Sequence, residues 1–129
     1  MKKLILIILT MLLLAACGQS KDKKQEAVYV NIMAEEAKKI MDNQEGYVIL
    51  DTRTQAEFDE GHIPGAILIP HDEITEKAET LLTDKSQLIL VYCRSGRRSK
   101  LAAEDLVKLG YTNIKEFGGI IDWPYETTK

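Results

Sequence analysis

The chain has 129 residues, a formal net charge of −3 and 45% hydrophobic residues. This length suits a single domain with one hydrophobic core. The acidic balance argues against nucleic acid as the main partner, because proteins that bind the phosphate backbone usually present basic surfaces.

The first residues have the pattern of a secretory signal. Lys2 and Lys3 precede residues 4–14, which are apolar apart from Thr10. This run is shorter than the about 20 residues that cross a bilayer, but it fits the apolar part of a signal peptide. Residues 1–16 are therefore expected to be removed.

A cysteine follows the apolar run. The segment Leu14-Ala15-Ala16-Cys17-Gly18 resembles the bacterial lipobox, in which the cysteine is acylated and becomes the first mature residue. An ordinary signal peptide followed by a chance cysteine is the alternative. Removal of residues 1–16 takes away two lysines and no acid, which moves the formal net charge from −3 to −5. Because the mature chain is acidic, the lipid on Cys17 would have to hold it at the membrane, with about 0.8 kcal/mol per buried CH₂. The expected location is extracytoplasmic, on a bacterial membrane.

The two cysteines leave two interpretations. A disulfide between Cys17 and Cys93 would be ordinary in an exported protein. If Cys17 carries a lipid, however, Cys93 is the only thiol of the mature chain. An unpaired cysteine in an exported domain indicates a function for the thiol, although an inert buried cysteine is the alternative.

Residues 17–27 are expected to be the lipidated cysteine and a flexible tether, because the segment after Cys17 is polar and lacks apolar periodicity. Residues 28–129 are expected to form one domain, with no internal repeat.

From residue 28 onward, short apolar runs alternate with amphipathic segments. Four helices are expected. The first has Met33, Ala37, Ile40 and Met41 on its apolar face, the second lies around residues 55–59, and the third covers residues 72–82. The fourth has Ala102, Leu106 and Leu109 on its apolar face. Asn31 is expected to cap the first helix, and Gly46 and Gly110 to end the first and the last. Strands are expected at residues 28–30, 47–50, 66–69, 88–92 and 113–117. This alternation predicts an α/β fold with a mostly parallel sheet and helices on both faces.

Asp51 and Cys93 each follow an apolar run directly and so mark the carboxyl ends of two predicted strands. Ligands of parallel α/β sheets bind at this end. The periodicity therefore predicts a site there, before any chemistry is considered.

The segment after Cys93 has the composition of an anion-binding loop. It reads Cys93-Arg94-Ser95-Gly96-Arg97-Arg98-Ser99 and leads into a predicted helix. The helix N-terminus offers unpaired N–H groups, Gly96 lets the backbone curl, and the arginines add positive charge. All three features favour the reactive thiolate form of Cys93. The alternative is a buried, inert cysteine followed by a solvated turn.

Three further motifs accompany this loop: Asp51-Thr52-Arg53 followed by Glu57-Phe58, Gly61-His62-Ile63-Pro64-Gly65-Ala66, and Gly118-Gly119 with Trp123. Together with the loop, they make the chain resemble the rhodanese family over essentially the whole predicted domain. Leu68 departs from the family pattern, where asparagine is frequent, and is expected to affect packing only.

The resemblance implies a rhodanese-like fold and a sulfurtransferase. Cys93 would attack the outer sulfur of thiosulfate or a similar donor, hold it as a persulfide, and pass it to a thiol or another thiophilic acceptor. The loop residues Ser95, Gly96 and Ser99 would surround the sulfur, and Arg94, Arg97 and Arg98 would bind the anionic donor. Asp51, Arg53 and His62 would brace the loop. No cofactor is implied, and a monomer is expected.

His62 beside a thiolate could be a general base, but a structural hydrogen bond is the favoured interpretation. His71 is expected at the surface or at a helix end, and Trp123 is expected to pack the C-terminus onto the domain. No metal site is expected, because the histidines and cysteines lack ligand spacing.

Three other functions remain as alternatives. A cysteine-dependent phosphatase or arsenate reductase would place an arginine six positions after the cysteine, where this chain has Ser99. A thiol–disulfide oxidoreductase is disfavoured by the absence of a Cys-x-x-Cys pair. A persulfide carrier or reactive-sulfur-binding module would share the Cys93 persulfide but turn over little alone.

Overall fold

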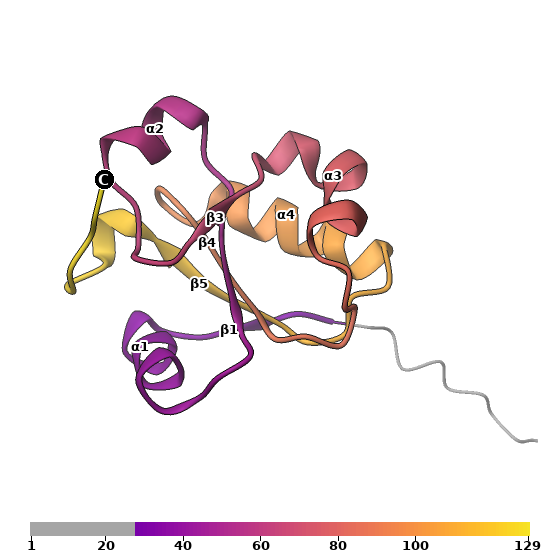
Figure 1. Ribbon diagram of the computed structural model, residues 1–129, viewed down its shortest axis with the longest axis horizontal. Helices are drawn as coiled ribbons and strands as arrows, with labels where there is room; N and C mark the ends of the chain where they lie inside the picture. The colour runs from indigo at the N-terminus through magenta and orange to yellow at the C-terminus, as the bar shows by residue number, and fades with distance from the viewer. Residues whose placement is uncertain (1–27) are drawn as a thin grey trace, which may run out of the picture.

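The computed structural model describes residues 28–129, so the expectations for the signal peptide, for Cys17 and for the tether lie outside the described residues. Five strands form a single parallel sheet in the order β1-β5-β4-β2-β3. The predicted α/β fold with a parallel sheet is confirmed (Figure 1). The strands are β1 (Val30–Asn31), β2 (Val48–Asp51), β3 (Ile67–Leu68), β4 (Ile89–Cys93) and β5 (Ile114–Gly119).

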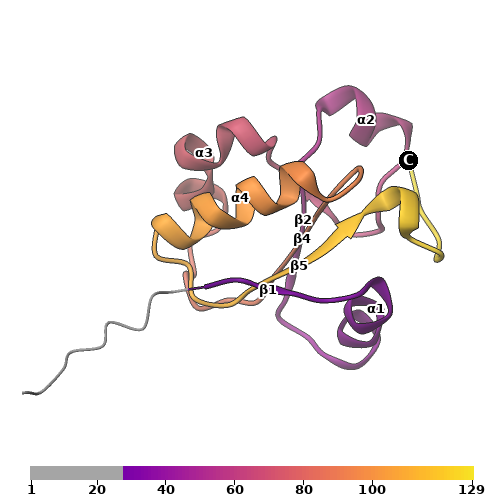
Figure 2. The ribbon, with the colours of Figure 1, turned by 180° about the vertical axis from the view of Figure 1, so that it is seen from behind.

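Helices cover both faces of the sheet, as predicted. Helices α3 and α4 lie together on one face and α1 lies on the other, while α2 lies near the C-terminus of the chain (Figures 1 and 2). No helix within residues 28–129 is long and apolar enough to cross a membrane. The helices are α1 (Ala34–Asn43), α2 (Gln55–Glu60), α3 (Ile74–Leu81) and α4 (Arg97–Lys108), with short 3₁₀ helices η2 (His71–Glu73) and η3 (Ile120–Asp122).

Each face of the sheet has its own hydrophobic core. Strand β4 supplies residues to both cores, because all five of its side chains are buried and alternate between the faces. Under α3 and α4 the core includes Ile74, Ala78, Val91, Ala102 and Leu106. Under α1 it includes Ala37, Ile40, Leu90, Tyr92, Phe117 and Trp123.

The helix ends differ from the prediction in two places. Helix α1 begins after Met33, which makes no side-chain capping bond, and the expected cap Asn31 instead pairs with Glu116 in the sheet. The same helix ends at Asn43, before Gly46, which adopts a positive φ of 76° in the following turn. The predicted helix over residues 72–82 is divided between η2 and α3. The prediction for Gly110 is confirmed, since it follows α4 with a φ of 95°.

Cys93 lies at the carboxyl end of β4, which is paired with β2 on one side and β5 on the other. The pairing of β4 with β5 shifts register between Val91 and Cys93, so that Cys93 is opposite Gly119. This shift brings the Gly118-Gly119 segment beside the start of the Cys93 loop.

Candidate active site

The Cys93 loop curls around its own sulfur atom. The backbone N–H of Gly96 donates a hydrogen bond to Cys93 Sγ at 3.0 Å. This contact depends on the left-handed conformation of Gly96, with a φ of 107°, immediately before α4 begins at Arg97. Sγ therefore lies at the N-terminus of a 12-residue helix, where a negative charge is stabilised.

The back of the loop packs directly on Gly119. A Cβ atom on Gly119 would lie 2.6 Å from Ser95 Cα and closer still to the carbonyl group of Arg94. The same carbonyl oxygen accepts a hydrogen bond from the N–H of Ile121 at 3.2 Å. Gly119 is thus required by space, because no other residue permits this approach of two backbones, whereas Gly118 has open space around it and a positive φ of 88°.

The three arginines of the loop have different environments. Arg98 makes a bidentate ion pair with Glu57 of α2, with N···O distances of 2.6 and 2.8 Å. The hydrogen bond from Arg98 lowers the pKa of Glu57 to about 2. Arg94 and Arg97 are exposed. Arg98 therefore holds the loop against α2, whereas the charges of Arg94 and Arg97 remain available to a ligand.

A cavity of about 600 Å³ lies beside the Cys93 loop. Arg94 forms part of its wall, together with Glu57 and Glu60 of α2 and with Ile120 and Ile121 of η3. Cys93 itself has no exposed surface. Cys93 is thus not among the residues that line this cavity, and a molecule bound there would reach Sγ only after the surrounding atoms move.

Behind the sulfur lies a buried polar chain. The hydroxyl of Ser99 is 3.3 Å from Cys93 Sγ and 2.8 Å from Oε1 of Glu116. The same carboxylate oxygen accepts a hydrogen bond from the N–H of Gly118 at 2.7 Å, and Glu116 is only 2% exposed. The sequence did not lead us to Glu116. The sequence feature that indicates a buried acid here is its position two residues after Ile114, because alternate side chains of a strand point to the same side.

A second buried network braces the neighbouring strand ends. Asp51 accepts hydrogen bonds from the Arg53 side chain at 2.7 to 3.1 Å and from the Tyr92 hydroxyl at 2.6 Å. Arg53 also donates to the carbonyl of Gly61, and the N–H of Ile63 donates to the Tyr92 oxygen at 3.0 Å. Burial and then the Asp51 contact raise the pKa of Tyr92, which stays neutral. The network ties β2 and β4 to the loop after α2.

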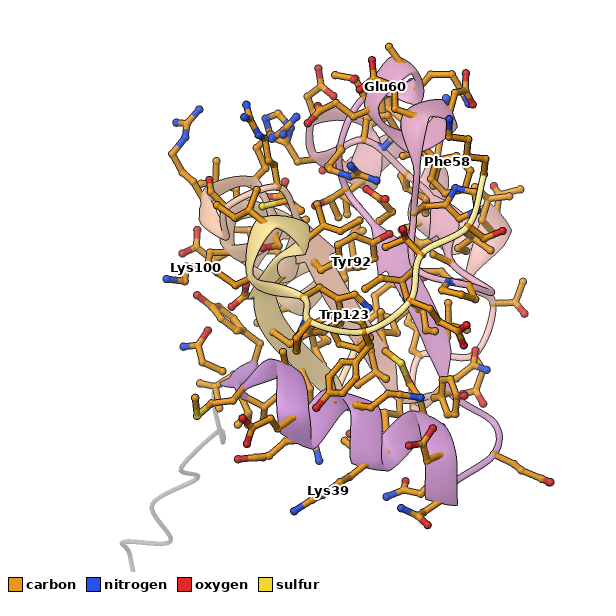
Figure 3. All side chains as sticks on the ribbon, turned by 90° about the vertical axis from the view of Figure 1, so that its left-hand side faces the viewer. Lys39, Phe58, Glu60, Tyr92, Lys100 and Trp123 are labelled. Carbon is orange, nitrogen blue, oxygen red and sulfur yellow. The ribbon has the colours of Figure 1, made fainter. Side chains whose placement is uncertain are left out.

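Figure 3 shows Tyr92 and Trp123 in the interior, with Phe58 and Glu60 of α2 toward one end of the molecule and Lys39 of α1 toward the other. Trp123 packs against Phe117 and donates its indole N–H to the carbonyl of Glu126. The expected packing of the C-terminus through Trp123 is thereby confirmed.

His62 belongs to the loop after α2. Its ring stacks on Phe58 with centroids 3.8 Å apart, and Nδ1 lies 2.9 Å from the Phe58 carbonyl oxygen. Its backbone exchanges two hydrogen bonds of 2.8 Å with Thr128. These contacts agree with a structural rather than a proton-transfer role.

Residues 33–124 match the family model for the rhodanese-like domain. The chain belongs to the rhodanese family. Among its relatives is the thiosulfate sulfurtransferase PspE of Escherichia coli, which is 38% identical over 73 residues, or 57% of this chain and 70% of that protein. A putative sulfur carrier protein of Bacillus subtilis, YrkF, is 36% identical over 97 residues, or 74% of this chain. The chain spans about half of the carrier's length, 51%.

Solved rhodanese structures share the fold. One is a rhodanese with anions from E. coli, which superimposes with a TM-score of 0.61 at 35% sequence identity. The match covers 64% of this chain and 98% of that one.

The rhodanese fold brings the predicted loop residues, from Cys93 to Ser99, to the carboxyl end of β4. Asp51 and Arg53 lie at the same end of the sheet, but they contact each other and Tyr92 rather than Cys93. Cys93 forms no disulfide within the described part of the chain, and Cys17 lies outside it. In residues 28–129 no group of three or more potential ligands is placed to hold a metal ion.

Proposed function

We propose that this rhodanese is a sulfurtransferase that moves sulfane sulfur from thiosulfate or a similar anionic donor to a thiol acceptor. The observation that supports this most directly is the hydrogen bond from the Gly96 N–H to Cys93 Sγ at the start of α4. The Gly96 N–H and the N-terminus of α4 would also stabilise the negative charge of a sulfur atom added to Sγ.

In the first half-reaction the Cys93 thiolate attacks the outer sulfur of thiosulfate. A new S–S bond forms, the bond between the two sulfur atoms of the donor breaks, and sulfite leaves with the electron pair. In the second half-reaction an acceptor thiolate attacks the outer sulfur of the persulfide and Cys93 leaves as a thiolate. No electron is supplied from outside, and each half-reaction conserves charge.

Arg94 is the arginine best placed to bind the donor. It is exposed and lines the cavity beside the loop, whereas Arg98 is held by Glu57. The sulfonate end of thiosulfate would pair with Arg94 and orient the outer sulfur toward the loop. Arg97, exposed on the first turn of α4, would add positive potential.

Ser99 supports sulfur transfer over phosphatase chemistry. It occupies the sixth position after Cys93, and its buried hydroxyl faces Sγ rather than solvent. A phosphatase of this type would need an arginine at that position to bind the phosphoryl oxygens. A persulfide carrier that needs a partner for turnover is the second candidate, supported by the similarity to YrkF over 74% of this chain.

The proposed location is extracytoplasmic, on a bacterial membrane, with acylated Cys17 as the attachment. The lipobox-like segment ending at Cys17 supports it, and because the chain after residue 16 is acidic, the lipid would have to supply the attachment. The measurement is membrane fractionation of cells that express the full chain or its Cys17→Ser variant. Membrane-bound wild type and a variant released from the membrane are expected. Equal distribution of the two proteins would contradict the lipid attachment.

Intact-mass spectrometry tests the chemistry. Purified protein mixed with thiosulfate is expected to gain the mass of one sulfur atom on Cys93, and cyanide is expected to remove it as thiocyanate. The Cys93→Ser variant is the control and should gain nothing. A stable adduct that small thiols and cyanide leave in place would favour the carrier. No adduct with thiosulfate, persulfides or polysulfide would contradict both candidates.

A further inference from the structure

Glu116 is a buried acid that the sulfur-transfer steps above do not use. It lies on β5, is 2% exposed, and has no cationic partner among the described residues. Burying a carboxylate without a cation is costly, so such a group calls for an explanation. Its Oε1 atom accepts hydrogen bonds from Gly118 N and from Ser99 Oγ.

The hydroxyl of Ser99 connects this acid to the sulfur. It has one hydrogen and four acceptors within reach: Glu116 Oε1 at 2.8 Å, the Gly96 carbonyl at 3.0 Å, Cys93 Sγ at 3.3 Å and the Gly118 carbonyl at 3.4 Å. Oε1 of Glu116 is the nearest of these acceptors, and a carboxylate accepts more strongly than a carbonyl oxygen or a sulfur atom, so it takes the hydrogen. A lone pair of the Ser99 oxygen then faces Sγ and can accept the thiol proton.

We propose that Cys93 gives up its proton to Glu116 through Ser99. The Cys93 S–H bond breaks as its proton joins the Ser99 oxygen, and the original Ser99 hydrogen moves to Glu116 Oε1. The product is a Cys93 thiolate that accepts a hydrogen bond from Ser99, beside a neutral Glu116. The total charge stays at −1, so a single negative charge moves from the carboxylate to the sulfur without solvent. This inference rests on the proposed function only in making Cys93 the nucleophile.

Few other ionisable groups lie around Cys93, Ser99 and Glu116. Arg98 of α4 acts on Cys93 by its charge but is paired with Glu57. Before β1, burial and then the charges of Glu104 and Glu116 raise the pKa of Tyr29, so this phenol stays neutral. Glu35 of α1 and Asp122 of η3 line a small pocket with Gly118 and Gly119. Arg98 is thus the cation of the described residues whose charge acts on Cys93, and its pairing with Glu57 offsets that charge.

A purely structural role for Glu116 is the competing explanation. Its bond to Gly118 N closes the turn in which Gly118 adopts a positive φ of 88°. Glu116→Gln separates the two roles, because the amide oxygen can still accept from Gly118 and Ser99 but cannot take a proton at neutral pH. Ser99→Ala interrupts the chain from the other side and leaves the bond between Glu116 and Gly118 in place.

The measurement is the pH dependence of the rate at which iodoacetamide, a neutral reagent, alkylates Cys93, followed by mass spectrometry of the Cys93 peptide. Two coupled acids share one proton over a range of pH, so the wild type is expected to show two steps separated by a plateau. Glu116→Gln and Ser99→Ala are each expected to lose the lower step and show one. Thermal unfolding of each variant checks that it is folded.

The proposal is overturned if the wild-type profile has a single step, or if a folded Glu116→Gln or Ser99→Ala protein keeps both steps. The wild-type profile alone is decisive if a variant fails to fold. Because alkylation needs no sulfur donor, its outcome is independent of the proposed function. A two-step profile without sulfur transfer would leave the proton relay standing and contradict the sulfurtransferase.

Discussion

The guanidinium of Arg98 and the carboxylate of Glu57 form a bidentate ion pair that joins the first turn of α4 to α2, across 41 positions of the chain. Both side chains are partly buried, with 21% and 26% of their surface exposed. The pair connects the Cys93 loop to one wall of the neighbouring cavity. It follows that one loop arginine holds the site together while another remains available to a ligand.

Arg98→Ala is expected to lower the free energy of unfolding by about 1–2 kcal/mol, since a bidentate, partly buried pair contributes more than an exposed one. Urea denaturation measures this change. Arg97→Ala is the matched control, because Arg97 is adjacent, exposed and forms no ion pair among the described residues. Equal destabilisation by the two substitutions would contradict a stabilising role for the Arg98–Glu57 pair.

Arg94→Ala is expected to raise KM for thiosulfate about tenfold, because a hydrogen bond to a charged group contributes roughly 1.5–3 kcal/mol. The rate constant kcat should change little, since the interaction binds substrate and transition state alike. Steady-state thiocyanate formation provides both constants. A loss confined to kcat, or a larger effect of Arg97→Ala on KM, would remove Arg94 from the donor site.

The Glu57–Arg98 pair also predicts a pH dependence of stability. The pKa of Glu57 falls from its ordinary value of 4.5 to about 2 in the folded chain. The pair therefore stabilises the fold fully above pH 4.5, and this contribution is lost as the pH falls from 4.5 through about 2. Over that range the stability difference between wild type and Glu57→Gln should shrink by about 1–3 kcal/mol, given partial exposure. Denaturation curves at several pH values measure it, and a constant difference would disprove the prediction.

How far the sequence predicts this molecule depends on the range of the interactions involved. The strand ending at Cys93 and the loop after it follow from local apolar runs, glycine and arginine positions, and the structure places both where they were expected. The pairing of Arg98 with Glu57 joins residues 41 positions apart, and no local pattern contains it. Glu116 was overlooked because its partners Ser99 and Gly118 come together only when β5 pairs with β4.

Tyr92→Phe is expected to destabilise the protein by about 1–3 kcal/mol, since it removes the donor to Asp51 and leaves the N–H of Ile63 without its acceptor. Chemical denaturation measures the loss. Tyr125→Phe is the control, because the Tyr125 hydroxyl forms no hydrogen bond with another described residue, and it should change stability little. If the two substitutions cost the same, the buried network contributes nothing beyond packing.

Gly119→Ala is expected to impair sulfur transfer more than stability alone explains. The new methyl group would force the backbone of Arg94 and Ser95 away from β5 and displace the loop that surrounds Cys93. Gly46→Ala is the comparison, because Gly46 has a positive φ of 76° but open space around it. It should cost about 1 kcal/mol of stability and leave transfer unchanged. Full activity of folded Gly119→Ala would show that the loop tolerates the shift.

Strand β4 is paired on both sides and buried throughout, whereas the loop that follows it has exposed residues at Arg94, Ser95 and Arg97. In hydrogen-exchange terms, the amides of β4 belong to the part of the molecule that opens only with global unfolding, and the loop can open by itself. Cys93 is the last residue of β4 and directly precedes the loop. The backbone of Cys93 is therefore expected to stay fixed in the sheet when the loop opens, because such an opening needs to displace only the few residues that follow it.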